Sequence, residues 1–263
     1  MKSWRYAESH TIRLLLSSAL SCAMIQQTIA GDAEDKTPPP AANTPQRLVS
    51  LAPHTTEYVY FLGAGNRLVG AVEYSDYPEE AKQVPRVGGY QTISLEKIAS
   101  LSPDLVLLWT SGNPSGIRDA LVERHAPLFE TDPHTLNDIV NDLHRLSQRI
   151  GTGNAGEERL QAFEQGIAQL RTQYGNRPKV SVFYQVWEKP LYTLGGTHFF
   201  SDLLETCGGT NIYADVKEPS PVVGFESLLS RKPDVILSSA RHGDKSLDTW
   251  KESWKQWQQI PAV

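Results

Sequence analysis

The stretch SLEKIASLSPDLVLLW, residues 94–109, decides the fold class, and the chain repeats its pattern as GFESLLSRKPDVILSS at residues 224–239. In each copy a glutamate, Glu96 or Glu226, is followed seven and eight residues later by Pro-Asp and then by an apolar run. Ser94 is a favourable N-cap, a first-turn glutamate suits the helix dipole, and proline ends a helix. The apolar run is typical of a buried parallel strand. Each copy therefore predicts a short helix, a tight turn and a strand.

Strand and helix signals alternate around both copies, which indicates an α/β fold with parallel sheets. The sequence predicts two Rossmann-like lobes, at residues 47–133 and 177–263. Between them, residues 134–176 carry apolar side chains at helical spacing and no strand signal, so we expect a long bridging helical segment. Ligands favour the carboxyl ends of parallel strands, and we therefore expect a ligand cleft between the lobes.

The first 46 residues are expected to lie outside the folded lobes. Residues 1–30 have a basic start, a short apolar centre and small residues before Gly31, which is typical of a cleaved secretory signal peptide. The alternative is a lipoprotein box, ALSC, at residues 19–22, although its residues before Cys22 fit poorly. Residues 31–46 are rich in Pro and Ala and predict a disordered leader. The apolar run at the C-terminal end suggests that the second lobe is truncated.

The charge balance excludes nucleic acid and anionic membrane as main partners. Removal of residues 1–30 takes three basic residues from 25 and one acid from 30, which leaves 22 against 29 and a net charge of −7. A surface this acidic repels polyanions. One cysteine, Cys207, remains, and in an exported chain it is either a free thiol or half of a disulfide.

No motif supports catalysis or metal binding. The chain has no HxH, HExxH, CxxC, GxSxG or phosphate-loop pattern, and its six histidines beyond residue 30 form no spaced metal set. We expect these histidines to be surface or loop residues: His54, His125, His134, His144, His198 and His242. A secreted hydrolase remains a remote alternative, since paired carboxylates leave no fixed spacing in a sequence.

Aromatic residues at strand ends and in loops are the strongest sign of a binding site. They occur at matching places in the two lobes, and such side chains suit a large, flat, partly apolar ligand. The alternative for any one of them is half-buried packing. The aromatic candidates are Tyr74, Tyr77, Tyr90, Trp109, Tyr184, Trp187 and Tyr192.

Glu96 and Glu226 occupy the same position of the duplicated unit. A glutamate in the first turn of a helix interacts favourably with the helix dipole, which would stabilise each helix by a few tenths to about 1 kcal/mol. The residues alone favour this structural interpretation of both glutamates. The other interpretation is that each lobe offers one carboxylate to an arginine of a symmetric dimeric partner.

The chain resembles the periplasmic cobalamin-binding proteins, which are the substrate-binding components of vitamin B12 ABC importers. The resemblance covers residues 46–263 and is carried by RLVSLAPHTTEYVYFLGAG (47–65), YSDYP (74–78) and LLETCGGTNIYAD (203–215). The strand-Pro opening, which ends at Pro53, and the L..L.PDLV pattern are shared with haem- and siderophore-binding relatives. YSDYP is more specific to the cobalamin branch.

The resemblance implies a non-catalytic, monomeric periplasmic protein with no cofactor, which captures a corrinoid and delivers it to a permease dimer. It implies that Tyr74, Tyr90, Trp109 and Tyr192 line the cleft, and Pro53 and Trp187 complete the expected ligand set. It also implies that Glu96 and Glu226 contact permease arginines. Cys207 would pair with a cysteine in the missing C-terminal segment.

Two departures weaken the assignment of cobalamin itself. Ser220 stands where the cobalamin branch has a cleft tryptophan, and Tyr90 replaces another tryptophan. One lost aromatic contact costs about 1–3 kcal/mol. Trp187 is placed to compensate. Cobinamide or another tetrapyrrole therefore stays open as the ligand, and haem or a ferric siderophore remains the alternative on the same fold.

Overall fold

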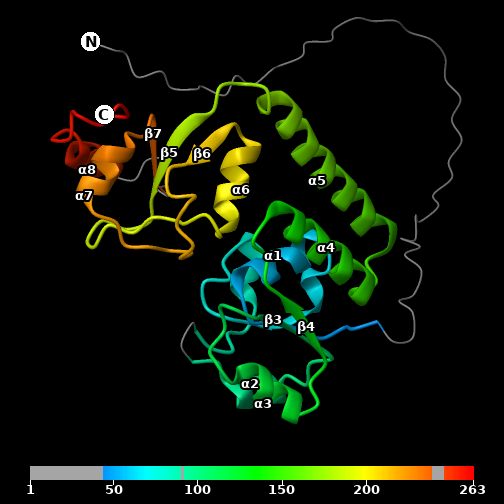
Figure 1. Cartoon of the computed structure of the whole chain (residues 1–263). Coiled ribbons are helices and arrows are strands. Elements are labelled where there is room, and N and C mark those ends of the chain that lie inside the picture. The colour runs from blue at the N-terminus through cyan, green and yellow to red at the C-terminus, as the bar shows by residue number, and fades with distance from the viewer. Residues whose placement is uncertain (1–43, 90–91, 239–245) are drawn as a thin grey trace, which may run out of the picture. The chain divides into compact units, whose positions relative to one another are not determined.

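The computed structural model of the chain describes residues 44–89, 92–238 and 246–263 (Figure 1). The predicted signal peptide, most of the predicted leader and Tyr90 lie outside these ranges. The described residues belong to a single compact unit of the chain. In the part of the chain that the structure describes, no helix is long and apolar enough to cross a membrane.

The first parallel sheet is formed by β1 (Leu48–Ser50), β2 (Leu68–Ala71), β3 (Leu105–Trp109) and β4 (Leu128–Thr131), in the order β2-β1-β3-β4. Its strands are short apolar runs, and β1 and β3 are almost completely buried because helices cover both faces. The helical elements of this region are α1 (Pro53–Phe61), the 3₁₀ turns η1 (Gly65–Arg67) and η2 (Glu79–Gln83), α2 (Leu95–Ser100) and α3 (Ile117–Glu123).

Two consecutive helices, α4 (Leu136–Ile150) and α5 (Gly153–Tyr174), follow the first sheet. Thr135 and Asp138 form a capping box that starts α4, and Gly151 ends it in the left-handed conformation with φ of 61°. The 22 residues of α5 make a helix about 33 Å long. Both helices pack into the core of the first sheet through Leu146, Ile150 and Leu160.

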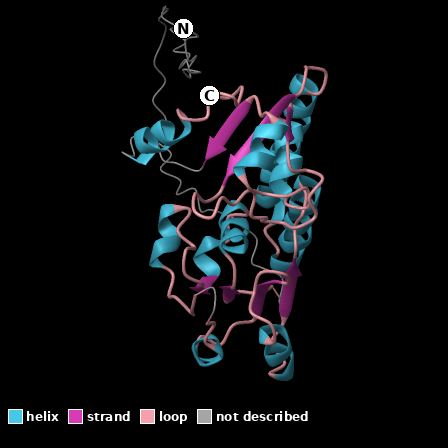
Figure 2. Ribbon diagram, turned by 60° about the vertical axis from the view of Figure 1, so that its left-hand side comes forward, coloured by secondary structure: helices cyan, strands magenta, loops and turns pink. Residues whose placement is uncertain are grey.

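The second parallel sheet is formed by β5 (Val180–Gln185), β6 (Gly209–Asn211) and β7 (Val235–Ser238), in the order β6-β5-β7. Its helices are α6 (Phe199–Thr206), α7 (Phe225–Arg231) and α8 (Ser246–Trp254). Phe183 of β5 and Trp254 of α8 belong to the core of this part. Figure 2 shows the strands of the two sheets as separate groups.

The Pro-Asp of each duplicated unit joins its strand to the first strand of the same sheet. The Asp104 carboxylate accepts hydrogen bonds from the backbone N–H groups of Gln46 (2.7 Å) and Arg47 (2.8 Å). The Asp234 carboxylate accepts from the backbone N–H (3.0 Å) and hydroxyl (2.6 Å) of Ser181. The aspartate therefore ties the start of β3 to β1 and the start of β7 to β5.

The residue before each of these prolines lies in the left-handed region. Ser102 has φ of 45° and Lys232 has φ of 46°. Few non-glycine residues adopt this conformation, which costs about 1–2 kcal/mol. The two copies thus share a turn geometry as well as a sequence pattern.

The predicted α/β class with two parallel sheets and a long intervening helix is confirmed. The strand and helix of both copies form as predicted, at α2-β3 and α7-β7. The sequence patterns predict no element at the positions of α3, β4, β6 or α8, all of which the structure contains. The domain limits at residues 133 and 176 stay a prediction; α4 begins at Leu136 and α5 ends at Tyr174.

Candidate functional site

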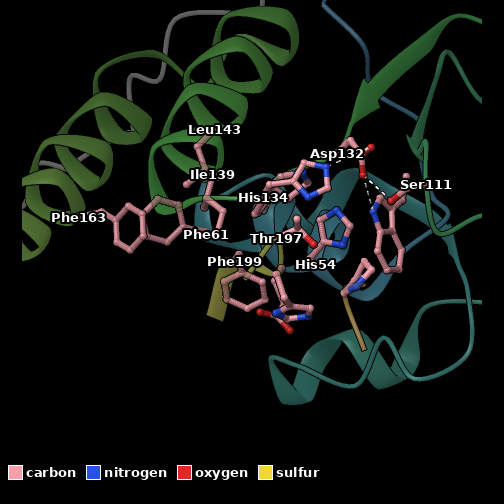
Figure 3. A pocket seen from close by; sticks show the side chains of 16 residues that line it. His54, Phe61, Ser111, Asp132, His134, Ile139, Leu143, Phe163, Thr197 and Phe199 are labelled. Carbon is pink, nitrogen blue, oxygen red and sulfur yellow. Dashed lines mark hydrogen bonds and ion pairs between the residues drawn. The ribbon is translucent and has the colours of Figure 1, made fainter. Parts of the chain in front are cut away.

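A cavity of about 460 Å³ lies beside α1 (Figure 3). Its walls come from α1, from the end of β3 and the loops that follow β3 and β4, from α4 and α5, from the segment around the start of α6, and from the loop between β6 and α7. The lining residues are His54, Glu57, Tyr58, Phe61, Trp109, Ser111, Asp132, Pro133, His134, Ile139, Leu143, Phe163, Thr197, His198, Phe199 and Pro219. Apolar and aromatic side chains dominate this set, as in most sites for organic ligands.

Trp109 is held in position by hydrogen bonds to two residues, Asn113 and Asp132. Its backbone N–H donates to Asn113 Oδ1 (2.8 Å), and Asn113 Nδ2 donates to the Leu51 carbonyl (2.7 Å). Its indole N–H donates to Asp132 Oδ1 (3.1 Å), which also accepts from the Ser111 hydroxyl (2.6 Å), as Figure 3 shows. These bonds fix the ring at the carboxyl end of β3, where it forms a rigid part of the cavity wall.

His54 lies against Trp109 in the first turn of α1. Its ring contacts the rings of Tyr58 and Trp109 edge to face, at centroid distances of 5.5 and 5.3 Å. Burial lowers the pKa of His54 to about 4, although the carboxylates of Asp142 and Asp132 oppose the shift. The imidazole is therefore neutral at pH 7.

The cavity offers little positive charge to a ligand. None of the described residues that line it is lysine or arginine. Its ionisable groups include two carboxylates: Asp132, and Glu57, whose pKa is raised by burial. His134 Nε2 lies 3.7 Å from Asp132 Oδ2, so a carboxylate lies next to the imidazole. This surface suits an uncharged or cationic ligand better than an anionic one.

The start of α6 completes the cavity from the other sheet. His198 is the N-cap of α6 and its Nδ1 accepts from the Phe200 N–H (3.2 Å), so in its neutral form its proton is on Nε2. Burial is the main cause of a lowered pKa for His198. α6 is tied to α4 by the Leu136 N–H, which donates to Asp202 Oδ2 (2.8 Å). Residues far apart in sequence therefore meet in one site.

Of the ligand residues predicted in the first lobe, Trp109 lines the cavity. Pro53 is the first residue of α1, partly buried and adjacent to His54. Tyr74 lies in the loop after β2 with φ of 65° and is 76% exposed, and it is not among the lining residues. Tyr90 lies outside the described residues.

Trp187 and Tyr192 are brought together in the loop after β5. They form an antiparallel bridge, and Tyr192 forms a second bridge with Val222. Trp187 is 65% exposed and Val222 is 55% exposed. This apolar surface does not belong to the cavity lining. The predicted ligand residues thus lie in different places: Trp109 in the cavity, Trp187 and Tyr192 in the loop after β5, and Tyr74 in the loop after β2.

The two predicted docking carboxylates are both exposed in the first turns of short helices, Glu96 in α2 and Glu226 in α7. Cys207 is the C-cap of α6 and is exposed as a free thiol in the described part of the chain. The disulfide expected for Cys207 stays a prediction.

Three of the histidines expected to be surface or loop residues line the cavity: His54, His134 and His198. For His54 the expectation is wrong, because it is a partly buried residue of helix α1 whose Nε2 atom is buried. The available signal was its position directly after the first strand and Pro53, at the carboxyl edge of the sheet. Among the residues that the structure describes, no group of three or more His, Cys, Asp or Glu could hold a metal ion.

Comparison with known proteins shows that residues 48–263 match the periplasmic binding protein family. A vitamin B12-binding protein of Vibrio parahaemolyticus is 37% identical over 223 residues, which are 84% of this chain and 80% of that protein.

Solved structures agree with this match. The crystal structure of the periplasmic vitamin B12-binding protein BtuF of Vibrio cholerae is 37% identical, with a TM-score of 0.76 over 83% of this chain and 84% of that one. The periplasmic haem-binding protein RhuT of Roseiflexus is 26% identical, with a TM-score of 0.66 over 73% and 76%. The resemblance predicted from the sequence is confirmed.

Proposed function

Because this chain belongs to the periplasmic binding protein family, we propose that it captures a corrinoid and delivers it to an ABC importer. It is a periplasmic binding protein and not an enzyme. Capture of this kind requires shape, stacking and a few hydrogen bonds rather than chemistry.

The observation that carries the proposal is the combination of an aromatic wall with a lining that has no lysine or arginine among its described residues. Trp109, His54 and Tyr58 present flat rings, which suit the face and edge of a macrocycle. Cobalamin carries no net charge and cobinamide is cationic, so neither requires a basic partner. The identity to vitamin B12-binding proteins supports the same ligand class.

Haem is the alternative, supported by the likeness to RhuT and by the neutral histidines in the cavity. It carries two propionates, however, and anionic groups bind most strongly to Arg and Lys. The described lining supplies neither.

We also propose that the loop with Trp187 and Tyr192, together with Pro53 and Tyr74, contacts the parts of the ligand that extend beyond the cavity. A corrinoid is larger than a cavity of about 460 Å³, and exposed aromatic side chains commonly mark a binding surface. Tyr90 belongs to the same proposed set.

Isothermal titration of the purified chain with cyanocobalamin, cobinamide and haemin tests the proposal. We expect binding of at least one corrinoid at micromolar concentration or tighter, and weaker binding of haemin. Tighter binding of haemin than of either corrinoid would favour the haem-binding alternative. The absence of corrinoid binding at about 100 micromolar would reject corrinoid capture as the function.

For delivery, we propose that Glu96 and Glu226 dock onto arginines of the two permease subunits, with the chain acting as a monomer after cleavage of its signal peptide. Glu96→Lys and Glu226→Lys should each lower uptake of labelled cobalamin by about fivefold or more, because like charges at an interface oppose docking. Ligand affinity should not change, since neither residue lines the cavity.

Matched controls are two exposed glutamates on other helices, Glu123 in α3 and Glu205 in α6. Charge reversal there should leave uptake within twofold of the wild type. Normal uptake by both Glu96→Lys and Glu226→Lys would reject the docking assignment.

A further inference from the structure

Two polar atoms in the cavity wall lack hydrogen-bond partners. Tyr58 OH and His54 Nε2 are both buried, and neither has a partner among the described residues. Tyr58 is 7% exposed, and both residues line the cavity. An unpaired buried polar group is costly, and native proteins seldom keep one without a reason.

The two atoms belong to a pair one helical turn apart. His54 and Tyr58 stand four residues apart on α1, so their side chains share a face, and their rings meet edge to face at 5.5 Å. In Figure 3 the His54 ring lies in the middle of the cavity residues. α1 begins directly after β1, at the edge of the sheet where a ligand is expected.

The pair is uncharged at neutral pH. Burial raises the pKa of the Tyr58 phenol, and the carboxylates of Asp142, Glu57 and Asp138 act in the same direction. His54 is neutral because burial lowers its pKa to about 4. A neutral phenol donates one hydrogen bond, and a neutral imidazole donates or accepts at Nε2. The complementary ligand group is one that both accepts and donates without charge, which is a carboxamide.

We propose that Tyr58 and His54 form a specificity site that recognises one side-chain carboxamide at the edge of the corrinoid ring. The Tyr58 hydroxyl donates to the amide oxygen, and His54 Nε2 pairs with the same amide. The pair selects against a carboxylate at that position, because the anion would enter a shielded site without a basic partner. This inference rests on the proposed function, and it specifies which chemical group of the corrinoid the site recognises.

The other cavity histidines are less suited to this role. His198 Nδ1 already accepts from the Phe200 N–H. His134 is 56% exposed at its side chain and lies 3.7 Å from Asp132. Among the cavity residues that the structure describes, the buried side-chain atoms without a hydrogen-bond partner are therefore those of His54 and Tyr58; a further such atom, Arg86 Nη1, belongs to a residue outside the cavity lining.

Tyr58→Phe gives the sharpest test because removal of the hydroxyl should have opposite effects on the free and the bound protein. Without ligand, an unpaired buried hydroxyl disappears, so the melting temperature should stay equal or rise by about 2–4 °C. With cyanocobalamin, a hydrogen bond to the ligand disappears, so affinity should fall about 5- to 10-fold. A hydroxyl with a purely structural role would instead lower the melting temperature.

Tyr60→Phe is the matched control, since Tyr60 lies on the same helix but outside the cavity lining. It should leave affinity for cyanocobalamin within twofold. His54→Leu should also weaken the binding of cyanocobalamin. The double variant should lose less binding free energy than the sum of the losses of the two single variants.

The amide is identified with the separated monocarboxylic acids of cyanocobalamin, in each of which one side-chain amide is hydrolysed. One isomer should bind the wild type at least tenfold more weakly than cyanocobalamin does, and Tyr58→Phe should reduce that penalty. If corrinoids bind but no isomer shows a penalty that depends on Tyr58 or His54, the inference is wrong and the function stands. A shift of the corrin absorption bands that requires His54 would also overturn it, because it would show coordination to cobalt. If no corrinoid binds, both proposals fail.

Discussion

Replacing Trp109 with alanine should lower the affinity for cyanocobalamin by about 10- to 100-fold. The indole forms a wall of the cavity and is fixed by hydrogen bonds to Asp132 and through Asn113. Its removal takes away one large aromatic contact, worth about 1–3 kcal/mol, without changing the charge of the site. Isothermal titration of the wild type and the variant measures the loss.

Trp109→Phe separates ring contact from positioning. Phenylalanine keeps most of the apolar surface but cannot donate a hydrogen bond to Asp132. The affinity of Trp109→Phe for cyanocobalamin should therefore fall by about threefold to tenfold, which is less than the fall for Trp109→Ala. Melting curves of both variants without ligand show whether the fold is intact. Equal affinity of Trp109→Ala and wild type would mean that the corrinoid does not enter this cavity.

Replacing Gln185 with leucine should lower the free energy of unfolding by about 2–4 kcal/mol. Gln185 is 4% exposed, and its Oε1 accepts from the indole N–H groups of Trp250 (2.6 Å) and Trp254 (3.1 Å). Leucine at this position would leave the indole N–H groups of Trp250 and Trp254 without this acceptor. Each buried donor that loses its partner costs about 1–3 kcal/mol of stability. Urea unfolding followed by tryptophan fluorescence measures the change.

Gln161→Leu on the exposed side of α5 is the matched control, and it should change the free energy of unfolding by less than about 0.5 kcal/mol. A cost below about 1 kcal/mol for Gln185→Leu would mean that α8 does not pack on β5 through this residue.

The sequence was sufficient for the fold because the decisive signals are local. A glutamate-led helix, a proline that ends it and an apolar strand lie within sixteen consecutive residues, 94–109. β6, by contrast, has three residues, Gly209–Asn211. That length is too short to show an alternating or continuous apolar pattern.

The site was less accessible to sequence reasoning because a position at a strand end fixes the edge of the sheet but not the direction of the side chain. Trp109 is the last residue of β3 and Tyr74 lies in the loop after β2, but of these two only Trp109 lines the cavity; Tyr74 is 76% exposed. His54 was missed because its burial depends on Trp109, which is far from it in sequence. Lining residues of this kind depend on tertiary packing.

The aspartates of the two Pro-Asp turns also have a consequence for chain entropy. Asp104 is bonded to residues 57 and 58 positions earlier, and Asp234 to a residue 53 positions earlier. Loop-closure entropy grows only with the logarithm of loop length, so these closures differ by about 0.1 kcal/mol. Pairing β1 with β3 therefore costs nearly the same loop-closure entropy as pairing β5 with β7. If one sheet forms earlier than the other during folding, the difference must come from the side chains that each sheet buries.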